Sequence, residues 1–409
     1  MKNSSSDLII IGSGAAGLMA AQEAAVSGCH VVVLEGGKSA GAKLLLSGGG
    51  RCNATNAVVT EQDFCSNAPR TVRHVLEHLR PAQFVTFLER HGVRLSLEED
   101  GKYFTAEGRA EAVLAALLAA ARQTGVRIEY NRRVQEVVFS DGSYTVSGEG
   151  FEYSAPVLLV TTGGLSYPAT GSTGFGYSVA RRFGHTLVPT VPALSPLLTD
   201  DKRWTGLSGV AVPCRLTFWL NNRKAAASAG PILFTHFGFS GPAALDLSRH
   251  WSVSTGEADR RLTVDFLPEL PARDLPDASA AVKKTARTVL SERLPARLAA
   301  VLLELAGIDA GRGWPGLNPK ERRRLQETCQ ACELPVSGVA GWGKAEVTAG
   351  GVDLGELAGA TLESRLQPGL FFAGEVLDVD GRVGGFNLHW AWASGVAAAR
   401  GAVKKLRIL

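Results

Sequence analysis

The sequence predicts an α/β fold in which both ends of the chain build one domain and the middle of the chain is inserted into it. Three observations lead to this prediction. A glycine-rich turn joins a strand to a helix near the N-terminus, a second apolar strand ends in Gly374–Glu375, and the composition changes between Pro189 and Pro196. A strand–helix–strand unit of the first kind belongs to a parallel sheet.

The first element is the glycine-rich turn with its flanking strands. A short apolar strand precedes the turn, an alanine-rich helix follows it, and a second apolar strand closes on an acid. Gly12 allows the tight turn, Gly14 lets a pyrophosphate approach the backbone, and Gly17 lets the helix pack on the strands. This is the dinucleotide-binding fingerprint, which FAD and NAD share. Its expected cofactor-binding residues are Gly12, Ser13, Gly14, Ala15, Ala16, Gly17 and Glu35.

A second glycine-rich stretch follows in the same domain. Three consecutive glycines precede Arg, Cys and Asn, a run that suits neither a helix nor a strand. It suits a loop whose backbone lies against a ligand. Arg51 is placed to pair with a phosphate, and Asn53 is placed to bond a ring edge. The residues expected at the ligand are Gly48, Gly49, Gly50, Arg51, Cys52 and Asn53.

The rest of the first domain alternates helices and strands. Apolar spacing predicts helices within residues 69–92, 109–123 and 176–183. The apolar run at 157–160 predicts a buried strand, and the carboxyl end of such a strand is where a sheet meets its ligand. The residues that follow this strand and are expected at the ligand are Thr162, Gly163 and Gly164.

The inserted middle of the chain shows two different secondary-structure patterns. Residues 197–270 are β-rich, and residues 271–335 show helical spacing of apolar positions. The predicted domains are a discontinuous Rossmann-type domain at 1–192 and 343–409, a β-rich domain at 193–270 and a helical domain at 271–342.

Composition predicts a packed soluble protein of two or three domains, with 409 residues, 45% hydrophobic and 20% charged. No run of 18 apolar residues and no signal-peptide core is present, so we expect a cytoplasmic protein without a membrane partner. The net charge is +4. The densest basic patch, Lys320–Arg324, has no interleaved aromatic residues, which favours a solvated helix face over a nucleic-acid surface.

The six cysteines follow no disulfide or metal framework. Cys329 and Cys332 form a lone CxxC pair, without the second pair of a zinc site and without the βαβ start of a thioredoxin-type motif. We therefore predict no metal site.

The second ligand-facing unit distinguishes FAD from NAD. A buried strand ends in Gly374–Glu375, and a glycine loop and an alanine-rich helix at 391–404 follow it. A simple NAD domain needs no such return of the chain. In an FAD domain the acid can bind the ribityl chain, and the helix start can face the pyrimidine end of the flavin. The sequence therefore predicts a discontinuous FAD-binding Rossmann-type domain.

Five motifs together resemble the aminoacetone-oxidase-like family of FAD flavoproteins. The motifs lie at residues 12–17, 46–56, 162–176, 235–242 and 372–381, so the resemblance covers nearly the whole chain. It implies non-covalent FAD in the Rossmann-type domain, an inserted β-barrel-like domain and a small helical domain.

The resemblance also implies cofactor contacts from both ends of the chain. Glu35 would hold the adenosine ribose, and Lys43 and the second glycine loop would lie along the cofactor. The chain has Ala42–Lys43 where members have Arg-Lys, and Phe386–His389 where they have Tyr-Asn-Leu-Gln. The C-terminal residues that would close on the flavin are Gly374, Glu375, Asp380, Gly385, Phe386, Asn387 and Leu388.

The sequence assigns no catalytic acid or base; the candidates are His236, Tyr167 and His389, with a structural role as the alternative.

Three functions stay open. The first is a reductase that passes a hydride from NAD(P)H through FAD to a small carbonyl or enone; NAD(P)H would bind transiently, because no second GxGxxG is present. The second is an FAD-dependent amine oxidase that uses dioxygen, as the resemblance implies. The third is an FAD protein that acts on RNA. A small-molecule substrate is favoured, and the oligomeric state is left open.

Overall fold

The computed structural model describes residues 6–257, 259–269 and 283–409. It divides into two compact units, one formed by the chain up to residue 191 together with 346–409, and one formed by residues 192–345. Each unit has its own cluster of buried hydrophobic side chains. The two ends of the chain therefore lie in one unit.

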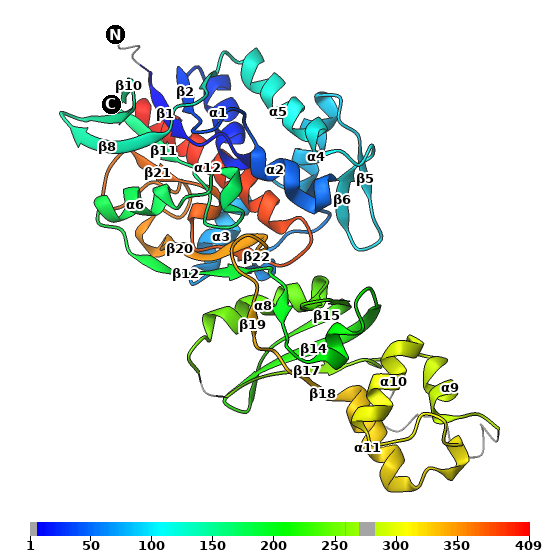
Figure 1. Cartoon of the computed structure of the whole chain (residues 1–409). Helices are drawn as coiled ribbons and strands as arrows, with labels where there is room; N and C mark the ends of the chain where they lie inside the picture. The colour runs from blue at the N-terminus through cyan, green and yellow to red at the C-terminus, as the bar shows by residue number, and fades with distance from the viewer. Residues whose placement is uncertain (1–5, 258, 270–282) are drawn as a thin grey trace. The chain divides into compact units, whose positions relative to one another are not determined.

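A five-stranded parallel sheet forms the centre of the first unit (Figure 1). In spatial order its strands are β21 (Leu370–Phe372), β11 (Val157–Val160), β1 (Leu8–Ile11), β2 (Val31–Leu34) and β7 (Arg127–Glu129). β1, β2 and β11 are buried at every position, as expected for parallel strands covered on both faces. This sheet confirms the predicted α/β fold.

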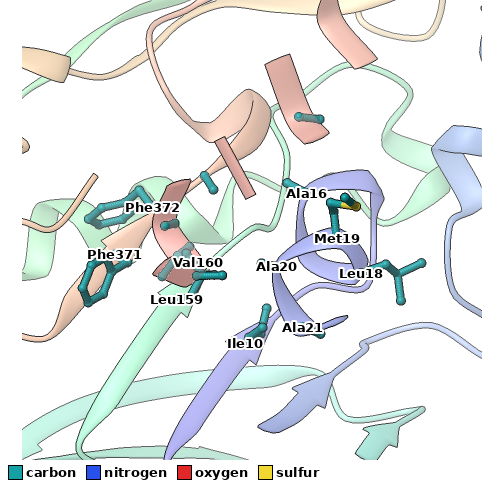
Figure 2. Close-up of a cluster of buried hydrophobic side chains, with 14 of the residues drawn as sticks. Ile10, Ala16, Leu18, Met19, Ala20, Ala21, Leu159, Val160, Phe371 and Phe372 are labelled. Atoms are coloured by element: carbon teal, nitrogen blue, oxygen red, sulfur yellow. The ribbon is translucent and has the colours of Figure 1, made fainter. Parts of the chain in front are cut away.

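Two helices from opposite ends of the chain pack against each other beside this sheet. They are α1 (Ala15–Val26) and α12 (Phe386–Leu406). A Cβ on Gly395 of α12 would lie 2.5 Å from the carbonyl oxygen of Ala16, so glycine at this position permits the close approach. Figure 2 shows the buried side chains that α1 and strands β1, β11 and β21 contribute to this core.

The helical region predicted at 69–92 is two helices, α3 (Pro69–Leu76) and α4 (Pro81–Arg90). Pro81 has no N–H to continue the first helix, whereas its fixed φ suits the first turn of the second. The break therefore falls just before Pro81.

The other elements of the first unit are three helices, two small sheets and two strand pairs. The helices are α2 (Ala42–Leu46), α5 (Ala110–Gln123) and α6 (Phe175–Arg182). Two three-stranded sheets contain β8 (Val134–Ser140), β9 (Ser143–Gly148) and β10 (Phe151–Ala155), and β3 (Asn53–Asn56), β5 (Leu95–Leu97) and β6 (Lys102–Thr105). Two strand pairs join β4 (Phe64–Cys65) to β22 (Asp380–Gly381) and β12 (Leu187–Ala193) to β20 (Val347–Val352).

The second unit is built on a seven-stranded antiparallel sheet whose two edge strands are β18 and β19. In spatial order its strands are β18 (Cys332–Leu334), β17 (Arg260–Asp265), β14 (Ala211–Leu220), β15 (Arg223–Thr235), β16 (Gly238–Ser240), β13 (Leu197–Leu198) and β19 (Gly338–Val339). Five of its strands lie within residues 193–270, where the resemblance implies an inserted β-barrel-like domain, and β18 and β19 lie within the stretch 271–342 that the sequence predicts to be helical.

Helices complete the second unit. They are α7 (Lys202–Thr205), α8 (Pro242–Val253), α9 (Ala286–Ser291), α10 (Ala296–Leu305) and α11 (Pro319–Gln330). The helical prediction for residues 271–282 lies outside the described residues. Trp314 and Leu325 of the helical part are buried in one cluster with Phe234 of β15, so helices and sheet share a core. Every helix among the described residues is too short or too polar to span a bilayer.

Candidate functional site

The turn after β1 forms an open cradle at the start of α1. Gly12 has a φ of +103°, and a Cβ there would lie 2.6 Å from the carbonyl oxygen of Thr161. A Cβ on Gly17 would lie 2.0 Å from the carbonyl oxygen of Gly12, so the helix packs directly on the turn. A Cβ on Gly14, by contrast, would meet no protein atom within 4 Å. Free space therefore lies at Gly14, beside the first N–H groups of α1.

Glu35 lies at one side of this cradle. It follows β2, and its carboxylate accepts hydrogen bonds from the Ser13 backbone N–H (3.1 Å), the Ser13 hydroxyl (2.5 Å) and the Gly37 N–H (2.7 Å). These bonds hold the acid next to the glycine turn, where a ribose hydroxyl could reach it.

The segment after β11 borders the cradle on another side. Gly163 has a φ of +72°, and a Cβ on Gly164 would lie 2.3 Å from the Thr348 hydroxyl oxygen. The Thr162 and Tyr177 hydroxyls are buried and have no hydrogen-bond partner among the described residues. A buried hydroxyl without a partner is costly, so these two groups point to a partner supplied by a bound molecule or water.

Three chain segments converge on the carboxylate of Glu375, just after β21. Lys43 of α2 forms an ion pair with it and also donates to the Ser166 hydroxyl. Ser166, after β11, donates to Glu375 Oε1 (2.6 Å), and the Thr348 backbone N–H in β20 donates to the same oxygen (2.9 Å). Side-chain exposure is 28% for Lys43 and 19% for Glu375, so the pair is screened from solvent only in part.

This network sets the charge of Glu375. Burial on its own would raise the pKa of the carboxyl, but the Lys43 ammonium and the hydrogen bonds from Lys43, Ser166 and Thr348 hold that pKa below its usual value. Glu375 is therefore an anion at neutral pH, fixed beside the carboxyl ends of β11 and β21. Next to it, Gly374 has a φ of +80°, and a Cβ there would lie 2.9 Å from Ala16 Cβ.

The second glycine loop has a left-handed backbone. Gly48, Gly49 and Gly50 have φ values of +58°, +66° and +88°, and a Cβ on Gly49 would meet nothing within 4 Å. Arg51, which the sequence assigns to a phosphate, pairs with Glu98 at 2.5 Å and lies 4.0 Å over the Phe104 ring. Burial raises the pKa of the Cys52 thiol to about 12, so this side chain stays neutral.

The first turn of α12 lies next to this loop. With its amide oriented to suit its neighbours, Asn53 accepts from the Gly385 N–H (2.9 Å) and donates to the Thr55 carbonyl (3.2 Å). Gly385 has a φ of +87°, which turns the chain directly into the helix. The helix therefore begins at Phe386, earlier than the predicted start at Ala391.

The side chains of Asp380, Phe386 and Asn387 are buried or bonded within the protein. Asp380 is 4% exposed, and Phe386 is fully buried. The Asn387 amide donates to the carbonyl of Gly381 and accepts from its N–H, both at 2.8 Å. A ligand at this segment would therefore meet backbone groups and the half-buried Leu388.

His389 is a structural histidine. It is fully buried, with Nδ1 2.8 Å from the Thr55 hydroxyl oxygen and Nε2 3.0 Å from the Leu79 carbonyl oxygen. Because a carbonyl only accepts, Nε2 carries the proton and Nδ1 accepts from Thr55. Burial lowers the pKa of His389 from 6.5 to about 4. Neutral and engaged at both nitrogens, His389 is unsuited to catalysis.

We expect His389→Gln to reduce the loss of stability at mildly acidic pH. The unfolded chain takes up the histidine proton below pH 6.5 and the folded chain only near pH 4. Stability is therefore lost as pH falls through this window, by about 3 kcal/mol. Urea unfolding at about pH 7 and about pH 4.5 should show a smaller loss for the variant than for the wild type. An equal loss would contradict this assignment.

The other two candidate catalytic residues lie in different units. Tyr167 follows Ser166 in the first unit, is half-buried and has a left-handed φ of +51°. Burial, and to a lesser extent the charge of Glu346, raises the pKa of its phenol. His236 lies in the second unit, where it is exposed in the turn between β15 and β16.

The cysteine pair has no features of a redox or metal site. Cys329 and Cys332 are both free and buried, and burial raises the pKa of each thiol to about 12. Such thiols are neutral at physiological pH and weakly reactive. No group of three His, Cys, Asp or Glu side chains suited to a metal lies within the described part of the chain.

Ser166, Thr348 and Tyr177 are site residues that the sequence prediction omitted. The signal for Thr348 is a polar residue in an otherwise apolar, fully buried strand. The Ser166 hydroxyl and the Tyr177 phenol lack such a signal, because their importance depends on contacts across the fold.

A parallel sheet, an open glycine cradle with an acid beside it, and a C-terminal helix that returns to the cradle define an oxidoreductase of the FAD-dependent Rossmann type. The chain belongs to the HI0933-like family, since the family model described as HI0933-like protein Rossmann domain matches residues 6–401. The predictions of an oxidoreductase and flavoprotein are thus confirmed.

Similar proteins cover nearly the whole chain. The ribosomal RNA dihydrouridine synthase of Escherichia coli (strain K12) is 33% identical over 96% of this chain and 97% of its own length. The 3-dehydro-bile acid delta(4,6)-reductase of Clostridium scindens is 32% identical over 97% and 98%. The 3-ketosteroid-delta4-(5alpha)-dehydrogenase of Rhodococcus jostii RHA1 shares the fold, with a TM-score of 0.51, 17% identity and 98% of both chains covered.

Proposed function

We propose that the protein is an FAD-dependent reductase of carbon–carbon double bonds that are conjugated to a carbonyl group. The observation that carries this proposal is that two relatives with different substrates are named for reductions of this type. In uridine the C5–C6 double bond is conjugated to the C4 carbonyl, and a 3-oxo steroid with Δ4,6 double bonds is a conjugated enone. Reduction adds a hydride to the carbon remote from the carbonyl and a proton to the carbon beside it.

The fit of the residues to FAD supports this proposal. The space at Gly14 and Gly49, the α1 N-terminus and the unpartnered Thr162 hydroxyl suit a large polar ligand with phosphates and hydroxyls. FAD held there would supply hydride transfer between transiently bound NAD(P)H and the substrate. The residues proposed to hold it non-covalently are Gly12–Gly17, Glu35, Lys43, Gly48–Asn53, Thr162–Gly164, Gly374, Glu375, and the segment from Asp380 to Leu388.

Tyr167 is the side chain that we propose donates the proton. It follows Ser166, whose hydroxyl bonds Glu375, so its backbone is fixed beside the acid network. Its left-handed φ is uncommon for a residue other than glycine, and such backbone conformations cluster at functional sites. The raised pKa keeps the phenol protonated throughout the physiological range. A protonated donor is what the second half of the reaction requires.

We expect Tyr167→Phe to lower the rate of substrate reduction by about 10²-fold or more, the contribution typical of a positioned acid. Flavin bleaching by NAD(P)H requires no such proton, so its rate should stay within about twofold of the wild type. Stopped-flow measurement of the two half-reactions separates these effects. An unchanged rate of substrate reduction would exclude Tyr167 as the donor.

Two substrate classes and one alternative reaction are tested together. Unmodified rRNA and a 3-oxo-Δ4,6 steroid are each incubated with the FAD-loaded protein and NADPH, and products are analysed by mass spectrometry. The proposal predicts that one of them gains two hydrogen atoms. The rRNA-named relatives favour RNA as a second substrate class, against the sequence-based preference for a small molecule. Oxidation of aminoacetone with consumption of dioxygen, and no reduction of either substrate, would favour the amine oxidase instead.

A further inference from the structure

We propose that the helical part of the second unit, residues 283–330, is a docking surface for the phosphate backbone of a structured RNA. This inference rests on the proposed reductase function, with rRNA as the substrate. The surface would position the RNA, and its bases would be read elsewhere.

Charge is concentrated in this part of the chain. Residues 283–330 contain ten Lys and Arg and five Asp and Glu, a net charge of +5, whereas the whole chain carries +4. The remaining residues therefore sum to −1. The ten cations are Lys283, Lys284, Arg287, Arg293, Arg297, Arg312, Lys320, Arg322, Arg323 and Arg324.

Backbone contacts bring these cations together from separate segments. The Trp314 N–H donates to the Lys284 carbonyl (2.9 Å), and the Arg287 N–H donates to the Ala310 carbonyl (3.2 Å), which joins the start of α9 to the loop before α11. Arg324 of α11 lies 3.5 Å from the carbonyl oxygen of Gly307, at the other end of this loop. The loop thus links the basic residues of α9 and α11.

Several of these cations are not neutralised. Arg312 pairs with Glu321 (2.6 Å) and Arg323 pairs with Glu327 (2.9 Å). Lys284 pairs with Glu292 (2.5 Å). The other seven form no ion pair with a carboxylate of the described residues, and four of these, all exposed, are Arg287, Arg293, Lys320 and Arg324.

The lack of aromatic residues, which favoured a solvated helix face in the sequence, excludes base stacking but not contact with phosphates. Trp314 is the one aromatic residue between 283 and 330, and it is fully buried, so no ring is available to stack on a base. Exposed cations without aromatic neighbours give affinity that depends on salt and little on sequence. A large folded RNA, with its closely spaced phosphates, matches this surface.

The test compares two quadruple variants of the full-length, FAD-loaded protein. The first replaces four exposed cations that form no ion pair, Arg287, Arg293, Lys320 and Arg324, with Gln. The matched control replaces four exposed arginines of the first unit, Arg70, Arg90, Arg94 and Arg122, with Gln. Each of the two variants has four fewer positive charges than the wild type. Binding to unmodified rRNA is measured by filter retention over a range of salt concentrations, and NADPH-driven enone reduction is measured in parallel.

We expect the first variant to bind rRNA at least about tenfold more weakly than the wild type at about 0.1 M salt. The slope of the logarithm of its binding constant against the logarithm of the salt concentration should be smaller in magnitude by about three. The control should bind within about twofold of the wild type, and enone reduction should be unchanged in both. Equal weakening in both variants would overturn the docking surface, as would no rRNA binding by the wild type. Either result leaves the reductase proposal intact if enones are still reduced. Binding of anionic vesicles but not rRNA would assign the surface to a membrane instead.

Discussion

Gly14→Leu is expected to give a folded protein that purifies without flavin. The Cβ at this position meets no protein atom within 4 Å, so the side chain fits the apo fold. The space that it fills is the space where the pyrophosphate would approach the backbone and the α1 N–H groups. Flavin absorbance per protein after reconstitution with FAD should fall to about a tenth of the wild-type value or less. Circular dichroism should stay unchanged.

A control separates this steric block from a general effect of the leucine side chain. Gly343→Leu places the same side chain at a second-unit glycine that also has no atom within 4 Å of its Cβ. It should retain full flavin. Gly17→Leu, in contrast, should unfold the first unit, because its Cβ would lie 2.0 Å from the carbonyl oxygen of Gly12. Full flavin in the folded Gly14 variant would show that the cradle is not the cofactor site.

Glu375→Gln is expected to weaken flavin binding by about tenfold or more and to remove part of the acid sensitivity of the fold. The substitution leaves the Lys43 ammonium, 28% exposed, without its ionised partner. Loss of one partner of such a partly buried pair costs about 1–3 kcal/mol. Flavin affinity is measured by fluorescence titration of the apoprotein, and stability is measured by thermal unfolding.

The pH dependence follows from the lowered pKa of Glu375. A carboxyl with a folded-state pKa below 4.5 stabilises the protein fully above that pH, and the contribution is lost as pH falls through the folded-state value. The wild type should therefore lose stability below about pH 4.5 more steeply than the variant. Glu292→Gln is the control, since its pair with Lys284 is about half exposed and should contribute little. An identical acid profile in wild type and Glu375→Gln would contradict the charged network.

The sequence predicts the cradle well because its features are local. The turn from β1 into α1 needs glycines at fixed spacing, and each has a steric reason in the structure: contact at Gly12 and Gly17, and free space at Gly14. Gly374, at the end of its strand, also has a steric reason, because a Cβ there would meet Ala16. Local chemistry and tertiary structure agree at these positions, which is why the fold could be predicted from them.

The roles of individual side chains are less predictable. Asn387 and His389 lie in the C-terminal segment expected at the ligand, but both side chains bond the protein. Asn387 forms two hydrogen bonds with the Gly381 backbone, and His389 bonds Thr55 and Leu79. Ser166 and Thr348 join the Glu375 network from segments far apart in the sequence. Whether a polar side chain faces the ligand or the fold depends on packing between such segments, and residue spacing does not encode that packing.

Anaerobic stopped-flow absorbance of the FAD-loaded protein tests the central proposal most directly. The protein is mixed with NADH or NADPH, and after bleaching it is mixed with a 3-oxo-Δ4,6 steroid or unmodified rRNA. The proposal predicts rapid bleaching by one of the nucleotides and recovery of the flavin band when an acceptor with a conjugated double bond is added. No bleaching by either nucleotide, with bleaching by a primary amine instead, would contradict it.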